Sequence, residues 1–154
     1  MTNQYAGRQY DVLAIRGAVA AGDVELSQTL FDSERDGEIC VGIQKLSQRW
    51  IMEFLTELGS MRFQPTRGCR FVTDLRRGRL RSQEDVVTSF GFSAFTITNN
   101  LQLEETDDMP DDERFDHAEL VEIVVAQDLV SLRVNVLSLA GGAREVILPV
   151  STAV

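Results

Sequence analysis

Arginine is concentrated in one part of this chain, residues 62–81, which we call the arginine-rich stretch. It holds seven arginines and one acidic residue, Asp74, so its formal charge is +6 (seven minus one) in a chain of net charge -9. The arginines are Arg62, Arg67, Arg70, Arg76, Arg77, Arg79 and Arg81. Guanidinium groups bind phosphates or carboxylates. Because the acidic remainder of the chain repels a polyanion, we predict no nucleic-acid partner. We expect ion pairs to carboxylates within the chain or on a neighbouring subunit, the alternative being a basic solvated loop.

A second charged part, residues 104–116, is acidic, and we call it the acidic stretch. It has eight carboxylates against Arg114, and Pro110 prevents a helix from running through it. A hand-type calcium loop needs a fixed ligand spacing and a glycine at its sharp turn, and both are missing here. A glycosidase needs two carboxylates held across a cleft, one of them with a raised pKa. A surface loop does not supply that burial, so we predict a solvated acidic loop.

Other residues capable of chemistry are few. His117 is the only histidine, and Cys40 and Cys69 are the only cysteines. Their spacing matches no zinc site, and we predict a surface histidine and two reduced thiols. Phosphate-binding, dinucleotide-binding and serine-hydrolase motifs are absent. The sequence therefore predicts a protein that is not an enzyme, without catalytic residues, cofactor or metal.

Two amphipathic helices are predicted in the middle of the chain. In the first, Ile43, Leu46, Trp50, Phe54 and Leu58 share one face, with Gly59 placed to cap its end. The second starts at Ser82, with Asp85 at the capping-box position, and ends near Leu103. Its apolar face consists of Val86, Phe90, Ala94, Ile97 and Leu101. The arginine-rich stretch between the helices is predicted to be irregular.

The last part of the chain predicts a three-stranded antiparallel β-meander. Apolar segments at 118–126, 129–139 and 144–150 are joined by short connections, and Leu132, Val134 and Val136 alternate with polar residues. A meander has free edges that a neighbouring strand can complete, although Pro149 cannot donate a hydrogen bond from the last segment. We predict an α+β fold in which two amphipathic helices pack with this meander.

The first part of the chain is less regular. Residues 10–41 predict short strands with a turn at Asp36-Gly37, and the first nine residues predict a mobile arm. We therefore divide the chain into residues 1–41, an arm with short strands, and residues 42–154, the helices and meander of the same single domain. No apolar segment is long enough to span a bilayer and the start does not resemble a secretory signal, so we expect no membrane partner and a cytosolic place of synthesis.

The order of these features resembles a known family, the sheath initiators of contractile phage tails, also called the GPW or lysozyme-like small baseplate wedge proteins. The resemblance covers roughly residues 42–150. It lies in Ile43, Leu46, Leu55, Thr56, Gly59, Pro65, Gly68 and Phe71, followed by a second helix and a meander. The Glu-Pro-Arg signature of the family corresponds here to residues 112–114, which read Asp-Glu-Arg and lack the proline, and Arg67 replaces an aromatic residue.

The resemblance implies a structural component of the virion tail baseplate, assembled in the host cytoplasm, with no hydrolytic site. Members of the family are present in six copies around the tail tube, bind the wedge subunits and add strands of the first tail sheath ring to their sheet. The expected partners are thus the tail sheath protein, baseplate wedge subunits and the tail tube.

We predict that wedge subunits bind through the first helix and the arginine-rich stretch. The predicted interface residues are Trp50 and Phe54 as apolar contacts, and Arg67, Arg70, Arg76, Arg77 and Arg114 as ion-pair partners. Two other functions stay open. The chain could be an adaptor or chaperone of a bacterial secretion system, or a cell-wall hydrolase that uses Glu113 of the acidic stretch.

Overall fold

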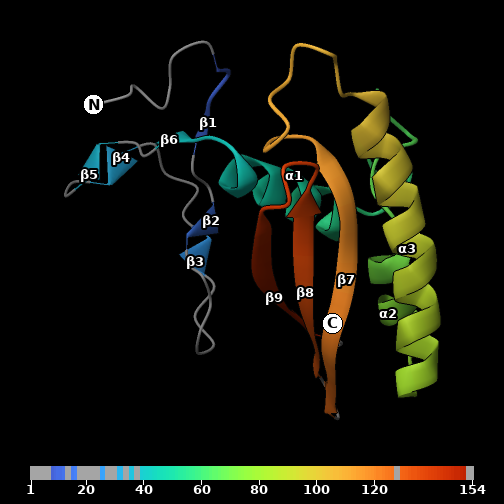
Figure 1. The fold of residues 1–154 in the computed structure, drawn as a ribbon. Helices are drawn as coiled ribbons and strands as arrows, with labels where there is room; N and C mark the ends of the chain where they lie inside the picture. Colours follow the sequence, from blue (N-terminus) through green and yellow to red (C-terminus); the bar gives the residue numbers. More distant parts are fainter. Residues whose placement is uncertain are drawn as a thin grey trace.

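The computed structural model describes residues 8–12, 15–16, 25–26, 31–32, 35–36, 39–126 and 129–151. The fold is α+β, with three helices beside a three-stranded antiparallel sheet (Figure 1). The helices are α1 (Ile43–Leu55), α2 (Phe71–Arg76) and α3 (Gln83–Leu103). The strands of the sheet are β7 (Phe115–Ala126), β8 (Leu129–Ser138) and β9 (Ala143–Ser151), in the order β7-β8-β9. The predicted α+β class and meander are confirmed.

Helix α1 is shorter than its apolar pattern predicts. The backbone becomes extended at Thr56, so Gly59 does not cap the helix, and Leu58 is exposed. A parallel bridge explains this end, because Cys69 N–H donates to the Thr56 carbonyl at 2.9 Å and Leu58 N–H donates to the Cys69 carbonyl at 3.0 Å. Pairing with a distant segment thus outweighs the local helical preference.

Helix α2 lies inside the arginine-rich stretch, where an irregular chain was predicted. Its apolar residues Phe71, Val72 and Leu75 are buried, and Leu80 just after it is buried as well. Spacings of one and four residues place the three helical side chains on one face. The prediction was wrong because the seven arginines masked this short apolar pattern.

Helix α3 follows its prediction closely. The side chain of Ser82 accepts from Asp85 N–H at 3.1 Å while the Asp85 side chain accepts from Ser82 N–H at 3.0 Å, which is a complete capping box. Four of the five predicted apolar positions are buried and Ala94 is partly buried. The helix ends at Leu103, as predicted.

The sheet and the helices share one core. Leu132, Val134 and Val136 of the central strand β8 are buried, as their alternation predicts. Helix α1 lies against β8 and β9, whereas α3 lies along β7 (Figure 1). Between the helices Trp50 stacks on Phe54 with ring centroids 5.1 Å apart.

Six two-residue strands precede α1 and form three antiparallel pairs. They are β1 (Asp11–Val12) with β6 (Ile39–Cys40), β2 (Ile15–Arg16) with β3 (Glu25–Leu26), and β4 (Phe31–Asp32) with β5 (Arg35–Asp36). Gln48 of α1 holds β1 by donating to the Val12 carbonyl at 2.8 Å. The predicted mobile arm covers residues 1–9, and residues 1–7 of it lie outside the described residues. Gly37 of the predicted turn also lies outside them.

Both cysteines are free and buried, in agreement with the prediction of reduced thiols. Among the residues that the structure describes, no helix is long and apolar enough to cross a membrane.

Candidate functional site

Two of the predicted interface residues belong to the core. Trp50 and Phe54 are fully buried within the monomer, where their rings contact Phe90 at centroid distances of 6.4 and 5.9 Å. A side chain without exposed surface offers nothing to a partner of the folded chain. We therefore remove Trp50 and Phe54 from the predicted interface, a correction that follows from their position on the inner face of α1.

Arg67 is used inside the chain. It forms an ion pair with the buried carboxylate of Glu53, and its other terminal nitrogen lies 2.6 Å from Glu104 Oε1. Glu53 also accepts a hydrogen bond from Gly68 N–H at 2.8 Å. Arg67 thus ties the arginine-rich stretch to α1 and to the first residue of the acidic stretch. This is the intramolecular form of the predicted ion pairs.

Other arginines make weaker pairs near the surface. Arg76 lies 3.2 Å from Glu57, and its side chain is 63% exposed. Arg114 lies 3.6 Å from Asp111 and 3.7 Å from Glu105, both within the acidic stretch. A pair as exposed as Arg76 with Glu57 contributes little to stability because water screens it.

Two of the five arginines predicted to bind a partner have no carboxylate partner among the residues that the structure describes. Arg70 and Arg77 lie at the two ends of α2, are exposed, and make no ion pair with any residue that the structure describes. The other three, Arg67, Arg76 and Arg114, are each paired with a carboxylate. Sequence reasoning could not separate Arg70 and Arg77 from Arg67, because the difference depends on carboxylates brought near by the fold.

The acidic stretch is not uniformly solvated, contrary to the prediction. Glu113 is 1% exposed, and its Oε2 lies 2.7 Å from the ammonium nitrogen of Lys45, the only lysine of the chain. Its Oε1 accepts from Gly42 N–H at 3.1 Å. Glu105 is also covered, and accepts from Phe115 N–H at 2.5 Å. Glu113 was missed because its partners lie elsewhere in the chain, and a lone lysine on α1 was the only available signal. Glu105 has its partners, Arg114 and Phe115, within the acidic stretch itself.

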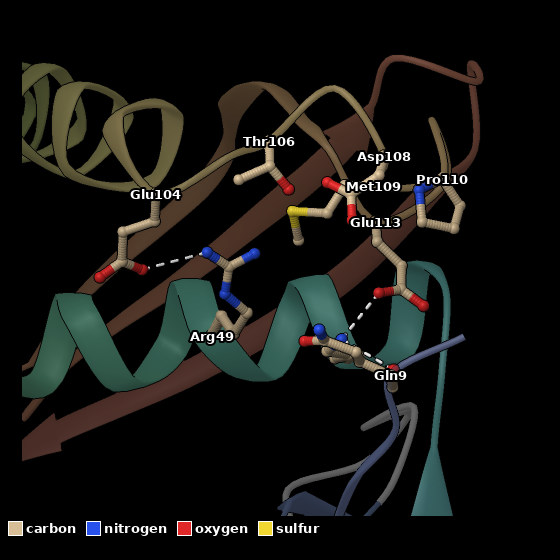
Figure 2. A pocket seen from close by; sticks show the side chains of 9 residues that line it. Gln9, Arg49, Glu104, Thr106, Asp108, Met109, Pro110 and Glu113 are labelled. Carbon is tan, nitrogen blue, oxygen red and sulfur yellow. Dashed lines mark hydrogen bonds and ion pairs between the residues drawn. The ribbon is translucent and has the colours of Figure 1, made fainter. Parts of the chain in front are cut away.

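A pocket of about 400 Å³ lies between α1 and the acidic stretch. Figure 2 shows Arg49 extending from α1 toward Glu104, and Glu113 extending from the opposite side toward α1. Its other lining residues are Gln9, Lys45, Thr106, Asp108, Met109 and Pro110. Both cations of the pocket are paired with carboxylates, so the arrangement resembles a structural clasp more than a binding site for a charged ligand.

The hydrolase alternative rests on Glu113. Its carboxylate contacts the Lys45 ammonium and the Gly42 N–H. Among the described residues no group of three or more His, Cys, Asp or Glu side chains could hold a metal ion. His117 is on the surface, as predicted, between Asp116 at 3.0 Å and Glu119 at 3.2 Å. The two carboxylates raise its pKa, Glu119 having the larger effect.

The remaining feature of interest is the edge of the sheet. Strands β7 and β9 each pair only with β8 among the residues that the structure describes, so their outer edges are unpaired there. Val121 and Val124 of β7 are about half exposed, and the register of β7 shifts between Leu120 and Glu122. A strand edge without a paired strand, with apolar side chains beside it, is a place where another strand can add.

Comparison of the chain with protein-family models, with curated proteins and with solved structures found no match.

Proposed function

We propose that this chain is a structural component of a contractile tail baseplate, which joins wedge subunits to the first ring of the sheath and has no catalytic role. The observation that carries this proposal is the three-stranded antiparallel sheet whose two outer strands are unpaired at their outer edges among the described residues. The order of motifs described above supports the same function. In the tail, six copies would surround the tube.

Strand addition at β7 is the proposed means of sheath binding. β7 has twelve residues, and its register with β8 is unbroken from Glu122 to Ala126, enough for several backbone hydrogen bonds with an incoming strand. Val121 and Val124 add apolar surface beside that edge. In β9, Pro149 has no N–H to donate, so an incoming strand would find fewer donors there. We therefore assign the sheath strand to β7.

The proposed contact with wedge subunits uses Arg70 and Arg77. Both guanidinium groups are exposed and free of ion pairs within the described residues, so a partner carboxylate does not have to displace an internal one. A guanidinium can bind a carboxylate through two parallel hydrogen bonds, which fixes orientation as well as contact. An acidic surface on the wedge subunit would complement the two ends of α2.

The experiment that tests this proposal is mass spectrometry of the proteins that co-purify with the tagged chain from its native lysate. We expect sheath and wedge proteins at stoichiometric levels. The Val121→Lys, Val124→Lys double variant should lose the sheath protein, because edge lysines oppose strand pairing. The Arg70→Glu, Arg77→Glu double variant should lose the wedge protein instead.

Leu139→Lys is the matched control, since Leu139 is similarly exposed but lies in the turn after β8. It should keep both partners. Recovery of secretion-system subunits or a soluble effector in place of tail proteins would contradict the proposal and favour the adaptor function. Equal loss of both partners in all three variants would show general misfolding, which circular dichroism of each variant detects.

A further inference from the structure

The outer face of α3 carries exposed apolar side chains. Residues 86–103 contain no Asp, Glu, Lys or Arg, although the helix lies at the margin of the fold (Figure 1). Phe92 is 73% exposed, Phe95 70% and Leu103 84%. Spacings of three and eight residues place these side chains along one side of the helix, away from the buried face. Exposed aromatic side chains in such a row mark a surface that another molecule covers.

Gly91 lies in the middle of this face. A Cβ atom added at Gly91 would meet no other atom within 4 Å among the described residues, so packing within the monomer does not require a glycine. Glycine is unfavourable inside a helix relative to alanine. A glycine on an exposed helix does allow the backbone of a partner to come close. Its position beside Phe92 therefore indicates a close contact outside the monomer.

Charged side chains near the two ends of this face that have no ion pair among the described residues differ in sign. The last turn of α3 itself has no basic residue, and its C-cap Glu104 is paired with Arg49 and Arg67. Glu84 is exposed in the first turn. At the other end a groove is lined by Leu103 and by Phe63, which is 89% exposed. The guanidinium carbon of Arg62 lies 5.5 Å from the centroid of the Phe63 ring. One end of the face is thus acidic and the other basic, so two copies that lie antiparallel bring opposite charges together.

We propose that α3 pairs antiparallel with α3 of a second copy of this chain, forming a two-fold symmetric dimer. In this arrangement Phe92 faces Phe95 of the second copy, Thr88 faces Asn99, and Glu84 approaches Arg62. The positive N-terminal end of each helix dipole also lies beside the negative C-terminal end of the other, which is favourable. The proposal depends only on this face and not on the tail function proposed above.

The size of the face sets the expected affinity. Taking ~200 Å² for an exposed aromatic side chain, the apolar residues named here offer on the order of 600 Å² per copy. A standard-size interface buries ~800 Å² per partner. A face smaller than this standard indicates a weak dimer, which should be visible as a concentration-dependent mass.

Sedimentation equilibrium of the purified full chain tests the dimer. We expect the mass to rise from monomer to dimer between micromolar and millimolar concentrations. Phe92→Lys should weaken the dimer by at least a factor of ~10, because each tenfold change corresponds to ~1.4 kcal/mol, less than the burial of a phenylalanine side chain. Leu139→Lys, the exposed control away from α3, should leave the association unchanged. A chain that stays monomeric at every concentration, or a Phe92→Lys variant that dimerises like the unchanged chain, would overturn the proposal.

The antiparallel geometry has its own test. Thr88→Cys and Asn99→Cys chains of different length are mixed and oxidised, and the product that joins one of each is measured. This mixed dimer should dominate, because Thr88 faces Asn99. If dimers of one variant with itself dominated, the antiparallel arrangement would be overturned. Glu84→Arg and Arg62→Glu should each weaken the dimer when present alone. The chain with both changes should recover affinity, because position 84 again meets an opposite charge at position 62. Failure of the double variant to recover would remove this ion pair from the interface.

Discussion

Glu113 and Lys45 form a buried ion pair, with 2.7 Å between the carboxylate oxygen and the ammonium nitrogen. The two residues are 1% and 8% exposed, and they join the acidic stretch to the first turn of α1. Lys45 also donates to the Gln9 carbonyl at 2.8 Å, so the same ammonium holds the segment before β1. Three parts of the chain that are distant in sequence thus meet at one charge pair.

Removal of one partner of this pair should be costly. Glu113→Gln keeps the shape of the side chain but leaves the Lys45 ammonium buried without a counter-charge. We expect a loss of about 3 kcal/mol in the free energy of unfolding, measured by urea titration. Glu145→Gln, at an exposed carboxylate 3.9 Å from Arg133, should cost less than about 0.5 kcal/mol. In the Glu113→Gln background Lys45→Met should cost little more, because the pair is already broken; fully additive costs would contradict the coupling.

Gly68 and Gly59 provide a matched test of a steric requirement. Both have φ of 83°, a conformation that strains any residue with a Cβ atom. At Gly68 an added Cβ would lie 2.2 Å from the Thr56 carbonyl oxygen, whereas at Gly59 it would meet nothing within 4 Å. Gly59→Ala should cost about 1 kcal/mol and Gly68→Ala at least about 3 kcal/mol in thermal or urea unfolding. Equal costs would show that the contact with Thr56 relaxes freely.

Local patterns in the sequence predicted some elements, whereas contacts between distant residues could not be predicted. The capping box of α3 and the alternation in β8 are local patterns, so both elements were predicted from neighbouring residues. The pair of Lys45 and Glu113 joins positions 68 residues apart, and no local pattern encodes it. The same applies to the contact that ends α1 at Leu55, because Cys69 supplies it from another part of the chain. Composition described the charges correctly, but only the fold decides which of them are buried.

The single histidine gives a direct test of local electrostatics. Hydrogen bonds to Glu119 and Asp116 raise the pKa of His117 above its ordinary value of 6.5. Folding therefore favours the protonated ring, and this contribution to stability is fully present below pH 6.5 and is lost as the pH rises through the folded pKa. Proton NMR should show one histidine resonance that titrates above pH 6.5. Glu119→Gln should move the pKa down toward 6.5, while Glu145→Gln should not; a pKa at or below 6.5 in the unchanged chain would contradict the two contacts.

The arginines of the arginine-rich stretch should separate into two classes when they are replaced one at a time. Arg67 pairs with the buried carboxylate of Glu53, so Arg67→Ala leaves that charge without its cation and should cost about 2–3 kcal/mol of unfolding free energy. Arg70 and Arg77 are exposed and unpaired among the described residues, so Arg70→Ala and Arg77→Ala should change stability by less than about 0.5 kcal/mol. Urea unfolding of the three variants measures the difference. If Arg70→Ala or Arg77→Ala proved as destabilising as Arg67→Ala, these two residues would have a structural role, and the proposal that they bind a partner would lose its basis.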